Sequence, residues 1–405
     1  MKKLLLIIAL AFIAFHFADA QEIKLVADKT YGVGNNWDKV FDSYYDKLDD
    51  CFKIGLRKRL VLYDDGKAIV SHATRNRYSV FDANGKFLKD IVIHFADKNK
   101  KPYNIQRIGG RIGNLFYTEA NNMGDIYFFD DNGLIVKELK IKYQSLEMLT
   151  LDDSHIAIFG GCSWSNKYRN FVSILNVNTG KDKIVCDAFE DYVKPLKDTD
   201  YYVVAEGIRK GRTADLHIAT INGQLVVSTP IDGLIRFYDF NGNKVSEKKV
   251  DWQPTVLSVE EQMKKQREQI KSLKEEALQN KSEMETSYYE KFIPLCEEGL
   301  KHITKPIDMG YFTIAIQGVQ DNILYFLNPA ESDKNQCHAY SVSEGKTVEQ
   351  CTFTSDEYDL AITKNRFVFY NGYLYGIQEL KDYDGMPLRL VRFVVKRGIS
   401  GSVFS

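Results

Sequence analysis

The sequence predicts an all-β fold, a six-bladed β-propeller, from a repeated turn, a fixed spacing and an aromatic composition. The phrase Asp-x-Asn-Gly follows an apolar and aromatic run at 82–85, 130–133 and 239–242. Asn-Gly between two such runs is a strong hairpin signal. Each of these turns follows another turn by 19 or 20 residues. Aromatic residues make up 13% of the 405 residues, a composition that suits strands.

Two hairpins at that interval form a four-stranded meander, and the unit recurs after 47 or 48 residues. Propeller blades repeat at about 40–50 residues, whereas a β-sandwich, the alternative, does not repeat a paired-turn spacing. Residues 193–206 predict one hairpin more than six blades need, so seven blades remain an alternative. The blades are expected at about 53–95, 105–143, 146–188, 215–250, 310–353 and from 359 onward.

The last of these units lacks a fourth strand after 388–396. Residues 22–27 predict a strand that has no partner nearby in the sequence. We expect this strand to complete the last blade, because such a closure removes a free sheet edge.

Residues 1–20 resemble a secretory signal peptide. Lys2 and Lys3 precede an apolar run too short to span a membrane, and Ala18-Asp19-Ala20 is typical of a cleavage site. An uncleaved anchor is the alternative. The prediction is a propeller domain over 21–405 that is periplasmic or secreted. The formal net charge is −1, which gives no indication of a nucleic-acid partner.

A helical arm is predicted as an insertion at 258–303. Ser258 and Glu261 form a capping box, in which each side chain accepts a free backbone N–H. Apolar residues follow at 259, 263, 270, 273, 277 and 284. This spacing is a narrow coiled-coil seam on a charged helix, so the arm should pack on the propeller or self-associate through 259–291. Pro294 is expected to end the helix, with a shorter helical stretch before Pro306.

Two segments carry the candidate ligand-binding residues. The long loop 160–169 contains Trp164, Tyr168 and Arg169, residue types that are enriched in binding hot spots. The predicted basic loop at 209–212 contains Arg209 and Arg212, which could hold an anionic ligand. The alternatives are that Trp164 only covers a blade edge and that the basic loop is only solvated.

The six cysteines contain no C-x-x-C pair, so neither a zinc nor a redox motif is indicated. Cys337 and Cys351 flank a predicted turn at 343–345 whose register places them directly opposite each other. We expect a disulfide between them in an oxidising compartment, with two reduced, buried thiols as the alternative. The pairing of Cys51, Cys162, Cys186 and Cys296 stays open.

No catalytic motif emerges from the sequence. It has no nucleophile elbow, and no His is spaced from another His or a carboxylate as metal ligands are. Hairpin chemistry explains the Asp-x-Asn-Gly turns without calcium. No cofactor, metal or catalytic residue is therefore predicted. A propeller enzyme that assembles its site from distant central strand ends stays open.

The repeated phrase and the stretch 223–239, followed by a helical insertion and another blade, resemble exported bacterial six-bladed β-propellers of the TolB-like and NHL-like groups. The resemblance covers about 50–396 and departs from NHL repeats, which place Asp and Arg more regularly. It implies an exported binding or scaffold protein that recognises a protein or glycan partner through its loop face and helical arm. The alternative is a propeller hydrolase or lyase acting on a saccharide or lactone.

Overall fold

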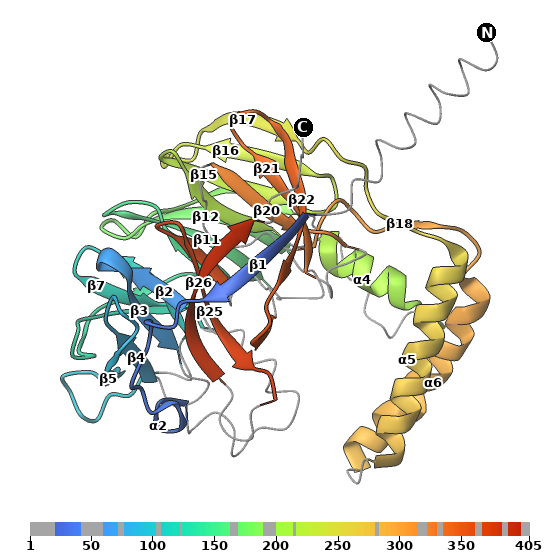
Figure 1. The fold of residues 1–405 in the computed structure, drawn as a ribbon, viewed down its shortest axis with the longest axis horizontal. Coiled ribbons are helices and arrows are strands. Elements are labelled where there is room, and N and C mark those ends of the chain that lie inside the picture. The colour runs from blue at the N-terminus through green and yellow to red at the C-terminus, as the bar shows by residue number, and fades with distance from the viewer. Residues whose placement is uncertain are drawn as a thin grey trace, which may run out of the picture.

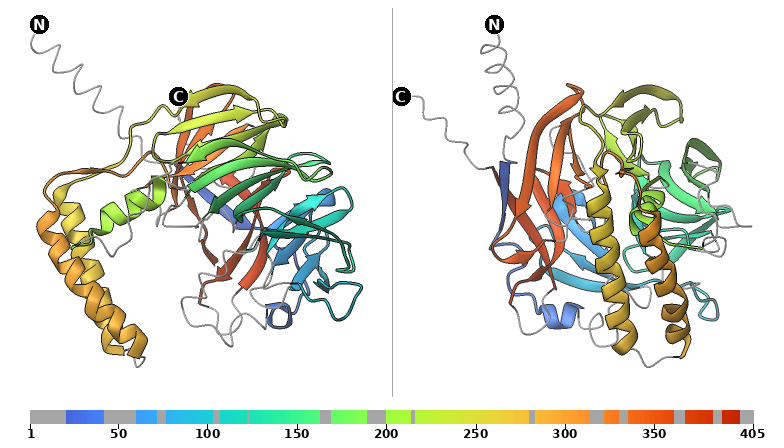
Figure 2. Two further views of the ribbon diagram at one scale, coloured as in Figure 1. Left: turned by 180° about the vertical axis from the view of Figure 1, so that it is seen from behind. Right: turned by 90° about the vertical axis from the view of Figure 1, so that its right-hand side faces the viewer.

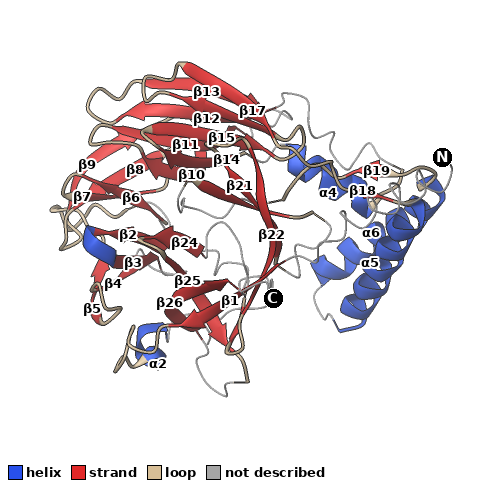
Figure 3. Cartoon of the chain, turned by 45° about the horizontal axis from the view of Figure 1, so that its top comes forward, coloured by secondary structure: helices blue, strands red, loops and turns tan. Residues whose placement is uncertain are grey.

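Strands dominate the computed structural model of the chain, and three longer helices lie to one side of them (Figure 3). The structure describes residues 21–41, 60–71, 77–102, 107–121, 124–162, 169–188, 200–213, 216–279, 283–313, 322–329, 335–360, 367–382 and 388–397. The predicted leader 1–20 lies outside these residues. No helix among them is long and apolar enough to cross a membrane.

Four sheets follow one another along the chain, and each contains four antiparallel strands in chain order. The first is β2 (Leu60–Tyr63), β3 (Lys67–Ser71), β4 (Arg77–Phe81) and β5 (Phe87–Val92); the second is β6 (Ile108–Ile112), β7 (Leu115–Thr118), β8 (Asp125–Phe129) and β9 (Ile135–Lys140). The third is β10 (Gln144–Thr150), β11 (His155–Cys162), β12 (Arg169–Asn176) and β13 (Asp182–Ala188); the fourth is β14 (His217–Ile221), β15 (Gln224–Thr229), β16 (Leu234–Tyr238) and β17 (Lys244–Lys249). All four lie at the predicted positions.

The fifth sheet has eight strands and contains both ends of the described chain. Its members are β20 (Ile323–Leu327), β21 (Gln336–Ser341), β22 (Lys346–Thr354), β1 (Gln21–Ala27), β26 (Leu388–Arg397), β25 (Tyr373–Leu380), β24 (Phe367–Tyr370) and β23 (Tyr358–Asp359). Strand β1 lies in the middle, parallel to β22 and antiparallel to β26. In Figure 1 it is the blue strand beside the red strands of the C-terminal part.

The sheets are arranged around a common axis as in a β-propeller. The first strands of successive sheets contact one another in the order β2, β6, β10 and β14, and β24 contacts β2 on the other side. Apolar clusters fill the spaces between neighbouring sheets; Ile69, Tyr78, Phe116 and Phe129, for example, join the first sheet to the second. The predicted propeller architecture is confirmed.

The repeated turns have the expected hairpin chemistry. Asp82 Oδ1 accepts the backbone N–H groups of Asn84 at 2.9 Å and Lys86 at 2.8 Å. Gly85 takes a φ of +74°, which glycine adopts without strain. Asp130 and Asp239 accept backbone N–H groups in the same way at the other two turns. Local hydrogen bonding therefore accounts for the Asp of the motif.

A β-bulge follows the turn between the third and fourth strands, a feature that the sequence did not predict. In five hairpins one residue of the outer strand has no partner opposite it. The unpaired residue is always Leu or Val, at Leu88, Val136, Val185, Val245 and Val348. Bulges increase the local twist of a strand. Four of these strands, β5, β9, β13 and β17, are sheet edges, which the bulge makes poorer templates for further pairing, whereas β22 pairs with β1.

Strand β1 is held by apolar contacts and by an ion pair at its end. Ile23 and Leu25 are buried beside Phe353 and Phe393. Immediately after the strand, Asp28 Oδ2 accepts hydrogen bonds from Arg392 Nε at 3.0 Å and Nη2 at 2.6 Å. The predicted pairing of 22–27 with the last strand is confirmed; the second pairing, with β22, was not predicted.

The helical insertion is an antiparallel pair that leaves the propeller between the fourth and fifth sheets. Strand β18 (Val256–Leu257) pairs with β19 (Ile307–Asp308) at its base. Helices α5 (Val259–Gln279) and α6 (Glu283–His302) then project from the sheets, as Figures 1 and 2 show. The capping box is present, because Ser258 Oγ accepts the N–H of Glu261 at 3.2 Å and Glu261 Oε2 accepts that of Ser258 at 2.7 Å.

The prediction that Pro294 ends a helix is wrong. Pro294 lies inside α6, and α5 ends at Gln279 instead. A helical proline removes one backbone hydrogen bond at a cost of about 3 kcal/mol. Packing of α6 against α5 offsets this cost, since Cys296 and the neighbouring Phe292 and Ile293 pack against Ile270 and Leu273.

The predicted extra hairpin at 193–206 is also wrong within the described part. Residues from Val204 onward form α4 (Val204–Thr213), which lies beside α5 (Figure 3). Val203 and Ala205 are buried against the base of the arm. Gln266 Oε1 accepts the N–H of Val204 at 2.8 Å and so satisfies one free donor of the α4 N-terminus. Tertiary packing thus overrides the β propensity of the Tyr-Tyr-Val-Val stretch.

We predict that Leu25→Asp lowers the free energy of unfolding by about 3 kcal/mol or more, because it places an unpaired charge among buried apolar side chains. Deletion of 21–28 should have a similar effect by exposing two strand edges. The control is Lys24→Thr in the same strand, where the side chain is exposed. Equal stability of Leu25→Asp and Lys24→Thr in urea unfolding would contradict the closing role of β1.

Candidate functional site

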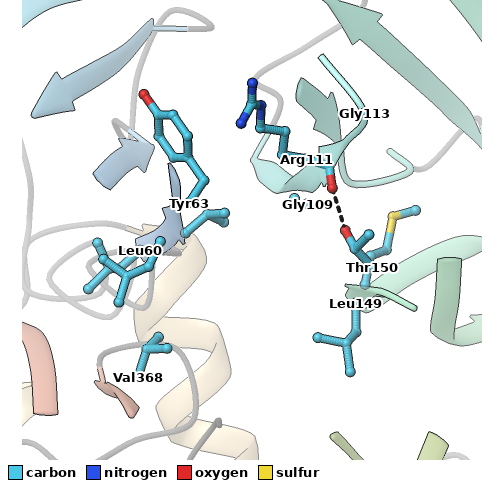
Figure 4. A pocket seen from close by; sticks show the side chains of 12 residues that line it. Leu60, Tyr63, Gly109, Arg111, Gly113, Leu149, Thr150 and Val368 are labelled. Carbon is cyan, nitrogen blue, oxygen red and sulfur yellow. Dashed lines mark hydrogen bonds between the residues drawn. The ribbon is translucent and has the colours of Figure 1, made fainter. Parts of the chain in front are cut away.

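A cavity of about 360 Å³ lies where strands from four different sheets approach one another. It is lined by residues of β2, β6, β10 and β24, which come from distant parts of the sequence. In Figure 4, Tyr63 and Arg111 face each other on one side, and Leu60, Leu149 and Val368 lie on the other. We call this cavity the channel pocket. Its volume falls within the range of small-molecule sites, about 300–1,000 Å³.

A glycine pair in β6 determines where Arg111 lies. The register of β6 against β7 shifts between Ile108 and Gly110. Without a bulge, Ile108 and Ile112 would share one face, because side chains alternate along a strand. Instead Ile108 packs between the first and second sheets, and Ile112 packs toward the third. The bulge therefore turns Arg111 toward β2 and Tyr63.

Arg111 lies among aromatic rings, and a carboxylate balances its positive charge. Nη1 forms an ion pair with Asp64 Oδ1. The guanidinium carbon lies 5.1 Å from the ring centre of Tyr63 and 5.6 Å from that of Phe116. Its buried Nε has no hydrogen-bond partner among the described residues. The Arg111 side chain is 19% exposed, so guanidinium N–H groups other than the buried Nε are available to a ligand.

Tyr63 supplies a second donor at the same side of the channel pocket. Burial raises the pKa of Tyr63 to about 12, and the nearby carboxylate of Asp131 adds to the shift. The phenol therefore stays protonated at neutral pH. Its ring meets Phe116 edge to face, with 5.0 Å between the ring centres. This contact fixes the direction of the hydroxyl.

The turn after Tyr63 places the partner of Arg111. Asp64 and Asp65 both have positive φ, +34° and +57°, within the short helical turn η3 (Asp64–Gly66). Aspartate is one of the few residues that adopt this region readily. The turn brings the Asp64 carboxylate across to β6, where it meets Arg111.

The opposite wall is joined to β6 by Thr150. Its hydroxyl donates to the carbonyl of Arg111 at 2.8 Å, as drawn in Figure 4, and lies 2.9 Å from the Tyr117 hydroxyl. A Cβ on Gly110 would come within 2.5 Å of that Tyr117 oxygen and 2.9 Å of Thr150 Oγ1. Gly110 is therefore required for the close approach of β6 and β10.

Of the predicted ligand-binding residues that the structure describes, none lines the channel pocket. Trp164 and Tyr168 lie outside the described residues. Arg169 begins β12 opposite Cys162. Arg209 and Arg212 lie in α4, so the prediction of a basic loop is wrong.

Sequence reasoning missed Tyr63 and Arg111. The signal that could have found them is the Gly109-Gly110 pair inside a strand, which indicates a bulge or a close approach. Among the described residues, no group of three or more His, Cys, Asp or Glu side chains could hold a metal ion.

The cysteine pair lies away from the channel pocket, between β21 and β22. Cys337 and Cys351 are buried and directly opposite, as predicted, with 3.1 Å between their sulfur atoms. Both are free thiols in this structure. The register predicted from a turn at 343–345 is wrong by one residue, because the turn itself pairs Ser341 with Lys346. The bulge at Val348 then shifts the pairing by one and places the cysteines opposite each other.

Comparison with known proteins gives structural likenesses only. No family model matches the chain, and no curated protein matches it. A duf4221 family member from Bacteroides vulgatus has a TM-score of 0.47 and 12% identity, over 94% of this chain and 100% of that one. Virginiamycin B lyase from Staphylococcus aureus has a TM-score of 0.39 and 10% identity, over 83% of both chains. BamB from Moraxella catarrhalis has a TM-score of 0.33 and 10% identity, over 83% of this chain and 82% of that one. The propeller assignment rests on the contacts between the first strands of successive sheets, described above.

We predict that Gly110→Ala destabilises the protein by about 1–3 kcal/mol, because the added methyl group overlaps Tyr117 and Thr150. Gly211→Ala is the matched control, since a Cβ there meets no atom within 4 Å on helix α4. That change should be neutral or slightly stabilising. Equal unfolding midpoints for the two variants would show that β6 and β10 do not need the glycine.

We predict a disulfide between Cys337 and Cys351 when the protein is isolated from an oxidising compartment. The bond would shorten the sulfur separation to about 2.05 Å and add up to about 3 kcal/mol. Mass spectrometry without reduction should find the linked peptides, with Cys186 and Cys296 as free-thiol controls. Free thiols at both 337 and 351 would refute the prediction.

Proposed function

We propose that the chain is an exported six-bladed propeller that binds a protein or glycan partner through its loop face and helical arm. The sheet topology supports six blades, because β1 joins two blades in the eight-stranded sheet: β20–β22 belong to one, and β24–β26 with β1 to the other. Four further sheets complete the count. The signal-peptide pattern at 1–20 supports export.

The observation that carries the proposal is an apolar surface on the projecting arm. Tyr288 and Leu278 are 52% and 87% exposed. Tyr288 stacks on Phe292 with 5.3 Å between ring centres and meets Tyr289 edge to face at 5.5 Å. Aromatic side chains are enriched at the centres of interfaces. We use the name arm surface for the exposed Tyr288 of α6 and Leu278 of α5, together with the partly buried Tyr289 and Phe292 beside Tyr288.

Hydrogen bonds of one buried side chain join the elements at the base of the arm. Gln266 is fully buried, and its Nε2 donates to the carbonyls of Tyr202 at 2.8 Å and Cys296 at 2.7 Å. One side chain thereby joins α5, α6 and the segment before α4. The seam residues Ile270 and Leu273 were expected to pack on the propeller or on a second copy. They are instead buried against Cys296 of α6.

The channel pocket supports the alternative, a hydrolase or lyase acting on a saccharide or lactone. Tyr63 and Arg111 could polarise a ligand there. The described lining has no His and no Cys to act as base or nucleophile. Binding is therefore the function that we favour.

We predict that Tyr288→Ala lowers partner binding on glycan or peptide arrays by about tenfold or more, the loss typical of an interface hot spot. The melting temperature should stay the same, because the side chain is exposed. Glu290→Ala, another exposed position on α6, is the control and should bind as wild type. Binding that survives Tyr288→Ala together with Leu278→Ala would contradict a role for the arm, and turnover of a saccharide or lactone would favour the enzyme.

A further inference from the structure

We propose that the channel pocket binds a small neutral ligand with hydroxyl or carbonyl groups at one end and an apolar body at the other. This site is separate from the arm surface and does not depend on the function proposed above. The pocket has polar side chains on one side and apolar ones on the other (Figure 4). Such a division favours a ligand with the same two parts.

The charges around the polar side favour a neutral head group. Arg111 supplies one positive charge, and its ion pair with Asp64 balances it. The negative charge of the Asp131 carboxylate is near enough to Tyr63 to raise the pKa of its hydroxyl. A ligand carboxylate would have to compete with Asp64 and would be repelled by Asp131, whereas a hydroxyl or carbonyl group would not.

Both donors and an acceptor lie close together around the Arg111–Asp64 pair, an arrangement that suits a ligand hydroxyl group. The Arg111 guanidinium is partly exposed and has N–H donors beyond its ion pair, and the Tyr63 hydroxyl keeps its proton. The Asp64 carboxylate is an acceptor beside them. A hydroxyl both donates and accepts, so adjacent hydroxyls of a sugar could bond to the guanidinium and the carboxylate together.

The apolar side determines what the rest of the ligand must be. Leu60, Leu149 and Val368 present only hydrocarbon to the cavity. A fully polar sugar would leave its hydroxyls unpaired against them, which is unfavourable. An alkyl chain on the sugar would instead displace water from this surface. Alkyl glycosides therefore represent the ligand class.

The test is calorimetric titration of the full chain with methyl, butyl and hexyl β-glucoside. Affinity should rise about three- to fourfold for each added methylene until the apolar side is filled, since each buried methylene contributes about 0.8 kcal/mol. Hexanoate should bind more weakly than hexyl glucoside. Tighter binding of hexanoate, affinity independent of chain length, or no binding at roughly 10 mM ligand would each overturn the proposal.

Three variants locate the binding. Arg111→Met should weaken hexyl glucoside about tenfold or more, as expected for loss of a charged hydrogen bond. Arg236→Met is the matched control, because Arg236 has the same 19% side-chain exposure and also pairs with carboxylates, in the fourth sheet. Tyr63→Phe removes one hydroxyl only and should weaken binding about three- to tenfold. It tests the site even if Arg111→Met does not fold.

Wild-type affinity in both Arg111→Met and Tyr63→Phe would overturn the assignment of the site. Tyr288→Ala should bind the glucosides as wild type, because the arm surface takes no part. A failure of the glucoside series therefore leaves the function proposed for the arm unaffected, and the reverse also holds.

Discussion

Strand β1 is the element on which the rest of the molecule depends. It hydrogen-bonds to β22 on one edge and β26 on the other, so the N-terminal strand joins two strands from the C-terminal part of the sequence. The Asp28–Arg392 pair holds its end, and the Arg392 guanidinium lies 4.8 Å from the ring centre of Tyr31. This closure keeps β24 next to β2, and those strands form one side of the channel pocket.

Neighbouring sheets are joined at the repeated turns as well as through their apolar faces. A Cβ on Gly242 would meet Val185 of the preceding sheet at 2.6 Å, and Lys183 Nζ donates to the carbonyl of Asn241 at 2.8 Å. Val185 is itself the bulged residue of that outer strand. The same device, a bulge, turns Arg111 toward Tyr63 in β6. Bulges thus serve both packing between sheets and the geometry of the pocket.

In the helical arm, the hydrogen bonds of one buried polar side chain specify how the helices pack. Gln266 forms three hydrogen bonds, to the N–H of Val204 and to the carbonyls of Tyr202 and Cys296. A buried amide is favourable only when it is satisfied, so the arm has one arrangement in which Gln266 is paired. The arm surface and the channel pocket are consequently separate sites on a scaffold with defined geometry.

Local interactions let the sequence determine the hairpins and the Ser258 capping box, since each depends on residues close in the chain. The opposition of Cys337 and Cys351 depends in addition on the bulge at Val348, which the sequence did not predict. The pairing of 22–27 with the last blade was predictable because an unpaired edge had to be covered. Only tertiary packing decided that 204–213 is a helix and that α6 continues through Pro294. The site itself could not be predicted. Tyr63, Arg111 and Val368 come together only when the sheets pack around the common axis. In addition, the bulge in β6 is needed to turn the Arg111 side chain to the other face of its strand.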